Sequence, residues 1–379
     1  MLGPILLKTE YGMMAASISV HLKNAILALV FGIFPLAQFF SAPLIGDFAD
    51  IYGRKKGFYL SLLGMTVGFT ISAWAIFDHN IVLFFFSRLL TGLFAGNMGI
   101  CMASIADLSP DESVRGKNFS TVTALFGISW VAAMVVGGYV ATPKVLGSFG
   151  PVFAFLFTAL LTLINFFLIL LMFKDTAPKS GVKSFRFWKG VENIKEMLHL
   201  KGSKLYFFVY FLWSLGWVIA VQWYPPYSIE VYQASVASFT NWYIVMGVLW
   251  ILGAFFTKYT LFSKYKSVNI GLFGFGSMTV CLFLMQSMGT FALFSLFFVL
   301  GAFFSPLAMG SSLNLISLSA SENVQGKIMG ISQSLQSISF VFVSAIAFLV
   351  SIDALSILFY FAAVISLAGF ILLFYKAKK

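Results

Sequence analysis

Charged side chains are rare in this sequence, and the densest group of them lies in residues 46–56, which read GDFADIYGRKK. Asp50 and Arg54 lie one helical turn apart, so their carboxylate and guanidinium can form charge-assisted hydrogen bonds. We expect both to act with Asp107, which ends a later apolar span, because a carboxylate there would neutralise the arginine. The chemistry available to this group is ion pairing that forms and breaks.

Apolar spans flank this charged stretch, from Ala25 to Ile45 and from Phe58 to Phe77. Each is about twenty residues long, which is enough to cross a bilayer as a helix. The stretch is therefore predicted to be a tight turn at a membrane surface, with Gly46 and Gly53 where the backbone needs positive φ or two helices come close. The adjacent cations at residues 54–56 place the turn on the cytoplasmic side by the positive-inside rule.

The stretch resembles the signature loop of the major facilitator superfamily, G-x-x-x-D-x-x-G-R-[KR]-[KR], which lies between the second and third helices of that family. One departure is Ile51, where many members carry a second arginine. The alternative is a generic basic turn, which any polytopic membrane protein needs. The resemblance implies that Asp50 faces the N-terminus of the eleventh helix, whose partial positive charge favours an anion. The expected gating residues are Gly46, Asp50, Gly53, Arg54 and Asp107.

The composition excludes a water-soluble globule, because 60% of the residues are hydrophobic and only 10% are charged. The net charge of +11 reflects membrane topology rather than nucleic-acid binding, because most lysines and arginines fall in loops predicted to be cytoplasmic. Cys101 and Cys281 lie inside apolar spans as small packing residues. No metal-ligand spacing, phosphate-binding loop or catalytic group is found, so we expect no enzyme, cofactor, metal or nucleic-acid partner.

Twelve membrane helices are predicted, and the first of them is incomplete. Residues 1–7 are apolar but end at Lys8, and as a helix they would cover about a third of the hydrocarbon core. The other helices are expected at residues 25–45, 58–77, 81–106, 119–141, 151–173, 205–224, 238–257, 268–287, 291–316, 327–350 and 354–375.

An internal repeat divides the chain into halves. Residues 108–117, LSPDESVRGK, align with residues 318–327, LSASENVQGK. The repeat predicts an N-terminal bundle at 1–173, a cytoplasmic linker at 174–204 and a C-terminal bundle at 205–379. The expected fold class is an all-α membrane protein with two six-helix bundles in pseudo-twofold repeat, whose first helix is truncated.

The linker itself has a helical pattern of apolar residues. Trp188, Val191, Ile194 and Leu198 recur at helical spacing and predict an amphipathic helix on the membrane surface. A disordered linker is the alternative.

Arg88 is the one cation inside a predicted helix, where a buried arginine needs water or a partner. With Gly92 it resembles the R-x-x-x-G signature of the family's fourth helix, which implies a role in proton coupling. Snorkelling toward the membrane surface is the alternative. The fifth helix keeps the closing pair Gly137-Gly138 of an antiporter element but lacks its proline, whereas residues 333–337, QSLQS, are similar to the Q-S-x-x-S element of drug/proton antiporters.

Polar and aromatic residues on shared helical faces are candidates for a substrate path. Amides deep in a membrane are unfavourable toward lipid, whereas aromatic residues near helix ends also occur as interfacial belts. The substrate-binding candidates are Asn97, Trp130, Trp213, Trp217, Asn314, Gln333 and Gln336. Prolines are expected to bend the helices at Pro35, Pro43 and Pro306, and the pair at residues 225–226 to end a helix.

These features predict a secondary active transporter of the major facilitator superfamily, closest in pattern to twelve-helix drug/proton antiporters of the tetracycline-efflux type. It would export a drug-like or amphipathic small molecule by alternating access, coupled to protons, as a monomer in the plasma (inner) membrane with its linker and C-terminus cytoplasmic. The alternatives are a proton symporter importing a small metabolite, favoured by the missing proline, and a non-transporting receptor or assembly factor on the same fold. All carboxylates fall in loops or at helix ends, so we expect the coupling carboxylate upstream of Met1 and the chain as given to be inactive or uncoupled.

Overall fold

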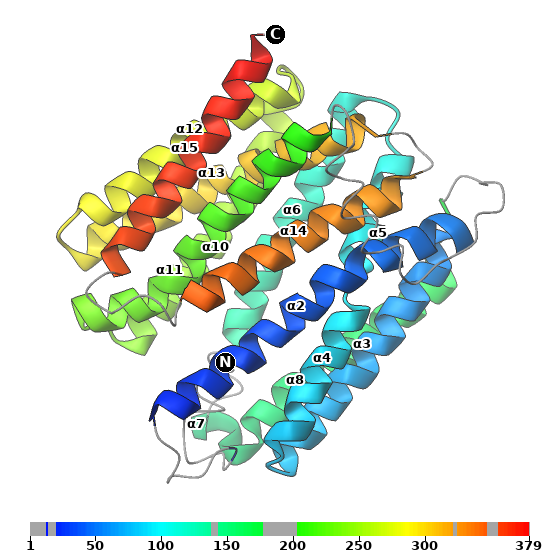
Figure 1. The fold of residues 1–379 in the computed structure, drawn as a ribbon, viewed down its shortest axis with the longest axis vertical. Helices are drawn as coiled ribbons and strands as arrows, with labels where there is room; N and C mark the ends of the chain where they lie inside the picture. The colour runs from blue at the N-terminus through cyan, green and yellow to red at the C-terminus, as the bar shows by residue number, and fades with distance from the viewer. Residues whose placement is uncertain are drawn as a thin grey trace. The chain divides into compact units, whose positions relative to one another are not determined.

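The computed structural model describes Met13 and residues 20–137, 143–176, 203–320, 324–346 and 355–378, and every element in these ranges is helical (Figure 1). The expected first helix and the amphipathic helix of the linker lie outside the described residues. The helices of the first half are α2 (Val20–Tyr52), α3 (Arg54–Phe77), α4 (Ile81–Phe94), α5 (Asn97–Asp107), α6 (Glu112–Val135), α7 (Pro143–Leu146), the 3-10 turn η3 (Gly147–Phe149) and α8 (Gly150–Met172). Those of the second half are α10 (Lys204–Tyr232), α11 (Val236–Phe256), the π-helical turn η4 (Thr257–Leu261), α12 (Ser267–Ser287), α13 (Phe291–Leu318), α14 (Gln325–Ile346) and α15 (Leu355–Ala377).

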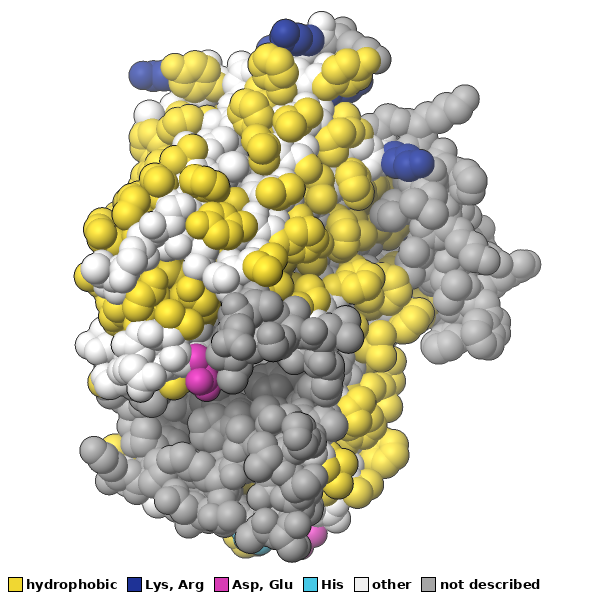
Figure 2. Space-filling model, turned by 60° about the vertical axis from the view of Figure 1, so that its left-hand side comes forward, with side chains coloured by type: hydrophobic (Ala, Val, Ile, Leu, Met, Phe, Trp, Pro, Cys, Tyr) yellow, Lys and Arg dark blue, Asp and Glu magenta, His cyan; other side chains and the backbone are white. Residues whose placement is uncertain are grey.

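Lipid is the solvent that this surface requires. Ten helical segments among the described residues are long and apolar enough to cross a bilayer. On α8, for example, large side chains such as Leu160, Leu168 and Leu171 are exposed. Figure 2 shows hydrophobic side chains covering most of one described face, with Lys and Arg side chains at its edges. The chain is therefore a multi-pass membrane protein.

The described helices pack into two compact units. The first contains α2, α3, α4, α5, α8 and α14, and the second contains α6, α10, α11, α12, α13 and α15. Within the first unit, α14 lies along α2 and against α5 (Figure 1). The units differ from the predicted sequence halves in two helices, α6 and α14, each of which packs with helices from the other half. The division of the sequence into repeat halves stays a prediction.

The signature stretch is mostly helix rather than loop. The α2 helix continues past the expected end at Ile45 to Tyr52, and α3 begins at Arg54, so Gly53 alone separates them. Gly53 has φ of 105°, a left-handed conformation that glycine adopts at little cost. At Gly46 the reason for glycine is close approach, because a Cβ atom there would overlap the carbonyl oxygen of Gly326 on α14.

The expectation that the Pro225-Pro226 pair ends a helix is wrong, since α10 runs through both prolines to Tyr232. Pro225 has no N–H to offer the carbonyl of Val221 one turn earlier. The Tyr243 hydroxyl on α11 donates to that carbonyl instead, so the helix continues with its acceptor satisfied. In the same way Pro43 leaves the Phe39 carbonyl of α2 open, and the Ser334 hydroxyl of α14 donates to it at 2.7 Å.

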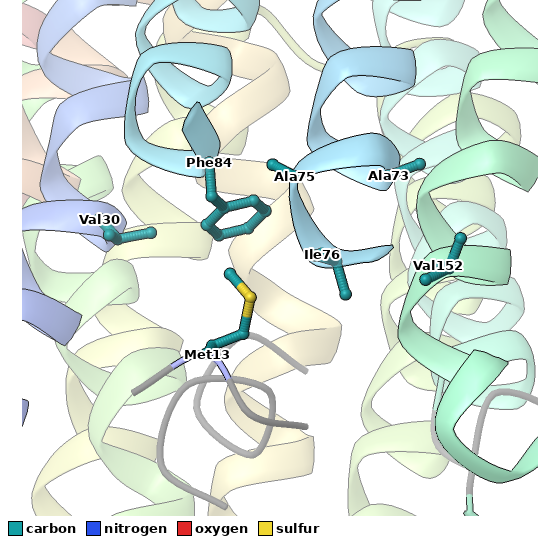
Figure 3. Close-up of a cluster of buried hydrophobic side chains, with 7 residues drawn as sticks. All are labelled: Met13, Val30, Ala73, Ala75, Ile76, Phe84 and Val152. Carbon is teal, nitrogen blue, oxygen red and sulfur yellow. The ribbon is translucent and has the colours of Figure 1, made fainter. Parts of the chain in front are cut away.

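The interior of the first unit includes a cluster of buried apolar side chains in which Phe84 of α4 is surrounded by other helices (Figure 3). Phe84 makes an edge-to-face ring contact with Phe155 of α8 at 5.5 Å. Figure 3 labels the cluster's buried members as Met13, Val30, Ala73, Ala75, Ile76, Phe84 and Val152. This packing fixes the face of α4 on which Arg88 also lies, one turn further on.

The fourth span departs from the single helix expected at residues 81–106. It consists of α4 and α5, which are separated by Ala95 and Gly96. Together the two segments still have the length and hydropathy of one membrane span.

Candidate functional site

Arg54 is a buried cation at the start of α3, with 0% of its surface exposed. Its Nη1 pairs with Asp50 one turn earlier on α2. Its Nε lies 3.0 Å from Asp107 Oδ2, and its Nη2 lies 3.4 Å from Asp107 Oδ1, at the end of α5. A buried charge without partners is costly, so these carboxylates hold α2, α3 and α5 together through one guanidinium.

Asp50 also reaches α14. Its Oδ1 accepts a hydrogen bond from the backbone N–H of Gly326 at 2.9 Å, and its Oδ2 accepts one from Lys327 at 2.7 Å. These are orphan amides of the first turn of α14, where the helix dipole favours a negative charge. The contact depends on the close approach of Gly46 to Gly326, which side chains would prevent.

The sequence gave no warning of Asp175, which completes this group. Its carboxylate accepts from the backbone N–H of Arg54 at 3.0 Å and of Lys55 at 3.4 Å, so it caps the first turn of α3. Thr176 adds a hydrogen bond to Asp107 at 3.2 Å. An aspartate directly after an apolar span was the available signal, but its partners lie far away along the chain. We call Asp50, Arg54, Asp107 and Asp175 the Arg54 cluster.

The second unit has a polar network at the start of α6. Glu112 Oε1 accepts from the backbone N–H of Ser267 at 2.8 Å and from the Ser267 hydroxyl at 2.6 Å, and so caps α12. Asn314 of α13, with 0% exposed, donates from Nδ2 to the Glu112 carbonyl at 3.0 Å and to the Ser267 hydroxyl at 2.8 Å. Asn314, a substrate-binding candidate from sequence, therefore lies within a structural hydrogen-bond network.

The first turns of α6 and α14 are docked in a similar way. Gly116 aligns with Gly326 in the internal repeat, and a Cβ atom at Gly116 would overlap the ring of Phe262 after η4. The Ser113 hydroxyl donates to the Phe262 carbonyl at 2.6 Å. Arg115 donates to the Ser317 hydroxyl at 3.1 Å, and Ser317 aligns with Asp107 of the Arg54 cluster. The repeat thus keeps the docking position but changes its chemistry from charged to mostly neutral.

Arg88 lies among aromatic rings within the first unit. Its guanidinium carbon is 4.7 Å from the ring centre of Phe34 on α2 and 5.9 Å from those of Phe69 on α3 and Phe155 on α8. Cation–π attraction of this kind strengthens as water is removed. Within the described part of the chain, no ion pair to Arg88 is found. The aromatic rings provide the stabilisation that a carboxylate would otherwise give.

Two of the candidate tryptophans belong to an aromatic group inside the second unit. The Trp217 ring stacks with Phe298 at 5.9 Å and lies 5.5 Å from Trp250, while the Trp213 indole donates to the Ser305 hydroxyl at 2.9 Å. Trp130 of α6 is only half-buried and stacks with Tyr243 at 6.4 Å. Trp213 and Trp217 are buried against their own unit, so Trp130 is the most open of the three.

The amide candidates of the first unit differ in availability. Gln333 uses both amide atoms on the backbone of the fourth span, with Nε2 donating to Ala95 and Oε1 accepting from Gly99. Gln336 and Asn97 are half-buried. Asn97, Gln333 and Gln336 lie in the first unit, whereas Trp130, Trp213, Trp217 and Asn314 lie in the second. The roles assigned to these residues stay predictions.

Known proteins place this arrangement in a family. A sequence model of the Major Facilitator Superfamily matches residues 1–344, so the chain belongs to that superfamily. Its members and the similar solved structures are transporters rather than enzymes, and the expected family is confirmed.

Individual relatives are similar over shorter stretches. Major facilitator superfamily domain-containing protein 10 of Bos taurus is 30% identical over 136 residues, which is 35% of this chain and 29% of that protein. The class E tetracycline resistance protein of Escherichia coli is 27% identical over 196 residues, which is 52% of this chain and 46% of that protein. The matches thus span less than half the length of these curated relatives.

Solved structures match over nearly the whole chain. The human organic anion transporter MFSD10 (TETRAN) has a TM-score of 0.76 at 18% identity, over 96% of this chain and 87% of that one. The proton:xylose symporter XylE has a TM-score of 0.74 at 15% identity, over 98% of this chain and 89% of that one. The expected all-α major facilitator fold is confirmed.

Proposed function

We propose that this chain is a secondary transporter that exports a drug-like amphipathic compound by alternating access, driven by proton entry. The observation that carries the proposal is the Asp50 carboxylate, which holds two backbone amides of α14 while it pairs with Arg54. Side chain to backbone bonds between helices are suited to repeated breaking, because neither helix needs to refold when they separate. Release of α14 from α2 would then open one side of the transporter.

Export of an amphipathic compound is supported by two further features. The chain is similar over about half its length to tetracycline resistance proteins of bacteria. The half-buried Trp130 and the aromatic group around Trp217 and Trp250 offer flat apolar faces to a ring-containing substrate.

A second candidate is transport of an organic anion, and Arg88 is the observation that favours it. Arg88 is a cation inside a span with aromatic rings but no described carboxylate beside it. An anionic substrate group would be attracted to this charge. Similarity in fold and sequence to MFSD10, whose human form is titled an organic anion transporter, supports the same reading.

Transport assays separate the candidates. The full chain in proteoliposomes with an imposed pH gradient would be offered tetracycline, the cationic dye ethidium and an anionic fluorescein dye. Proton-driven movement of the first two supports drug export, whereas movement of the anion alone, lost in Arg88→Gln, supports the second candidate.

The gating role of Asp50 is tested in the same assay. We expect Asp50→Asn to lower transport at least about tenfold, because an amide weakens the bonds to Arg54 and to the α14 amides. Asp47→Asn is the matched control, since Asp47 lies one turn earlier and its Oδ2 makes no hydrogen bond. Equal activity of the two variants would contradict the proposed gate.

A further inference from the structure

The interruption of the fourth span leaves backbone groups open within the membrane. The α4 helix ends at Phe94, Ala95 takes a non-helical conformation with φ of −80° and ψ of 53°, and α5 begins at Asn97. Two turn-type bonds, Ala95 N–H to Gly92 O at 3.2 Å and Gly96 N–H to Phe94 O at 2.8 Å, replace part of the helical pattern. Because water is absent from the bilayer core, the remaining groups need partners from the protein.

Side chains of the neighbouring helices supply most of these partners. The Ser41 hydroxyl of α2 donates to Gly92 O at 3.0 Å, and the Ser61 hydroxyl of α3 donates to Phe94 O. Gln38 of α2 donates from Nε2 to Ala95 O at 2.8 Å. These three side chains satisfy only acceptors, and all of them are on the α4 side of the interruption.

Gln333 of α14 is different, because it connects the two sides. Its Nε2 donates to Ala95 O at 2.6 Å, and its Oε1 accepts from the backbone N–H of Gly99, inside the first turn of α5, at 2.8 Å. The helices approach closely enough for this because Gly99 faces Gly330, where a Cβ on Gly99 would lie 3.1 Å from Gly330 Cα. Glutamine is the residue that presents one donor and one acceptor at this reach.

The neighbours of Gln333 on α14 support the same contact. Ser337 donates to Gln38 Oε1 at 2.6 Å, which turns the Gln38 amide nitrogen toward Ala95. Ser334 donates to Phe39 O, the carbonyl that Pro43 leaves open. The polar residues of this part of α14 thus attach to backbone irregularities of α2 and of the fourth span.

We infer that Gln333 is a positioning residue for transport, which ties the docking of α14 to the direction of α5. While α14 is docked, Gln333 holds the first turn of α5 against the end of α4. The last residue of α5 is Asp107, which pairs with Arg54. When α14 leaves, Ala95 keeps Gln38, but Gly99 loses its acceptor, so α5 and the Asp107 contact loosen together. The inference goes beyond the proposed export, and its test requires no substrate.

Cys101, one turn into α5, is a native reporter for this movement. The protein has two cysteines, so Cys281→Ser leaves Cys101 as the one thiol. We would measure the rate at which a hydrophilic maleimide alkylates Cys101 in the full chain reconstituted in lipid nanodiscs. We expect Gln333→Met, which removes two hydrogen bonds at nearly constant volume, to raise this rate about tenfold.

Three controls isolate the bridging role. Gln336→Met makes the same change one turn along α14, at a half-buried position, and should leave the rate within about twofold. Ser334→Ala removes a bond between α14 and α2 but none to α5, so it should raise the rate less than Gln333→Met. The reverse background, Cys101→Ser with Cys281 on α12, should show no effect of Gln333→Met.

A pH-dependent variant covers the case in which Gln333→Met does not fold. In Gln333→Glu the protonated side chain can donate to Ala95 and accept from Gly99, whereas the ionised form only accepts. Alkylation of Cys101, taken relative to Gln336→Glu at the same pH, should therefore increase as the pH rises. A pH-independent ratio, a Gln333→Met rate equal to that of Gln336→Met, or an equal effect of Ser334→Ala would overturn the inference.

Discussion

Arg54 shows how much structure one side chain can hold when it is buried among carboxylates. Its guanidinium contacts Asp50 on α2 and Asp107 on α5, and its own backbone N–H is capped by Asp175. The pairing of Asp50 with Arg54 could be predicted from their spacing of one helical turn. Asp175 could not, because a cap that comes from a distant segment leaves no local pattern.

Removal of Arg54 should therefore be expensive. Arg54→Ala leaves two buried carboxylates without their cation, and we expect it to lower the free energy of unfolding by about 3 to 5 kcal/mol. Arg54→Lys should fall between Ala and wild type, because lysine keeps the charge but not the forked geometry. Unfolding in mixed micelles measures both, with Lys55→Ala as a neighbouring control expected to change stability by less than about 0.5 kcal/mol. A loss from Arg54→Ala no larger than that of the control would show that the cluster contributes little.

At the scale of elements, helices here remain continuous through prolines because another helix replaces the missing donor. Tyr243 serves the carbonyl opened by Pro225, and Ser334 serves the one opened by Pro43. The sequence showed the prolines but not the replacement donors, so it predicted an end of the helix where there is none. The interruption at Ala95 was missed for the opposite reason, since neither a proline nor a run of polar residues marks it.

The approach of α2 to α14 gives a prediction at this scale. Gly46→Ala places a methyl group on the carbonyl oxygen of Gly326, so we expect it to displace α14 and to raise alkylation of Cys101 about tenfold. Gly32→Ala is the matched control on the same helix, because no atom lies within 4 Å of the added Cβ. In the control, helix propensity should hold or slightly improve stability. Similar alkylation rates for both variants would mean that α14 is not held by this contact.

For the whole molecule, composition, the repeat and the signature stretch were enough to predict a major facilitator fold in a membrane. What they did not predict is the exchange of helices in packing, in which α14 joins α2 and α5 while α6 joins helices of the second half. Periodicity identifies spans but carries no information about which distant span supplies the neighbour. For the same reason Asn314 was predicted to bind substrate, whereas it bonds Glu112 and Ser267.

The two polar contacts at the starts of α6 and α14 should contribute independently to stability. Glu112→Ala removes the cap of α12, and Asp50→Ala removes the acceptor of the α14 amides, and the two changes share no partner residue. We expect each to cost about 1 to 3 kcal/mol and the double variant to show the sum within about 0.5 kcal/mol. Unfolding of the four proteins in micelles measures this, and a coupling above about 1 kcal/mol would contradict independence.

The donors of α14 also have a consequence for biosynthesis. The α2 helix and the fourth span leave the ribosome long before Ser334 and Gln333 do, so the carbonyl of Phe39 and the amide of Gly99 enter the bilayer without those partners. Until α14 is synthesised, these helices carry polar groups that lipid cannot satisfy. The nascent chain must therefore keep them beside the translocon, an insertion chaperone or water, and final assembly of the first helices must wait for one of the last.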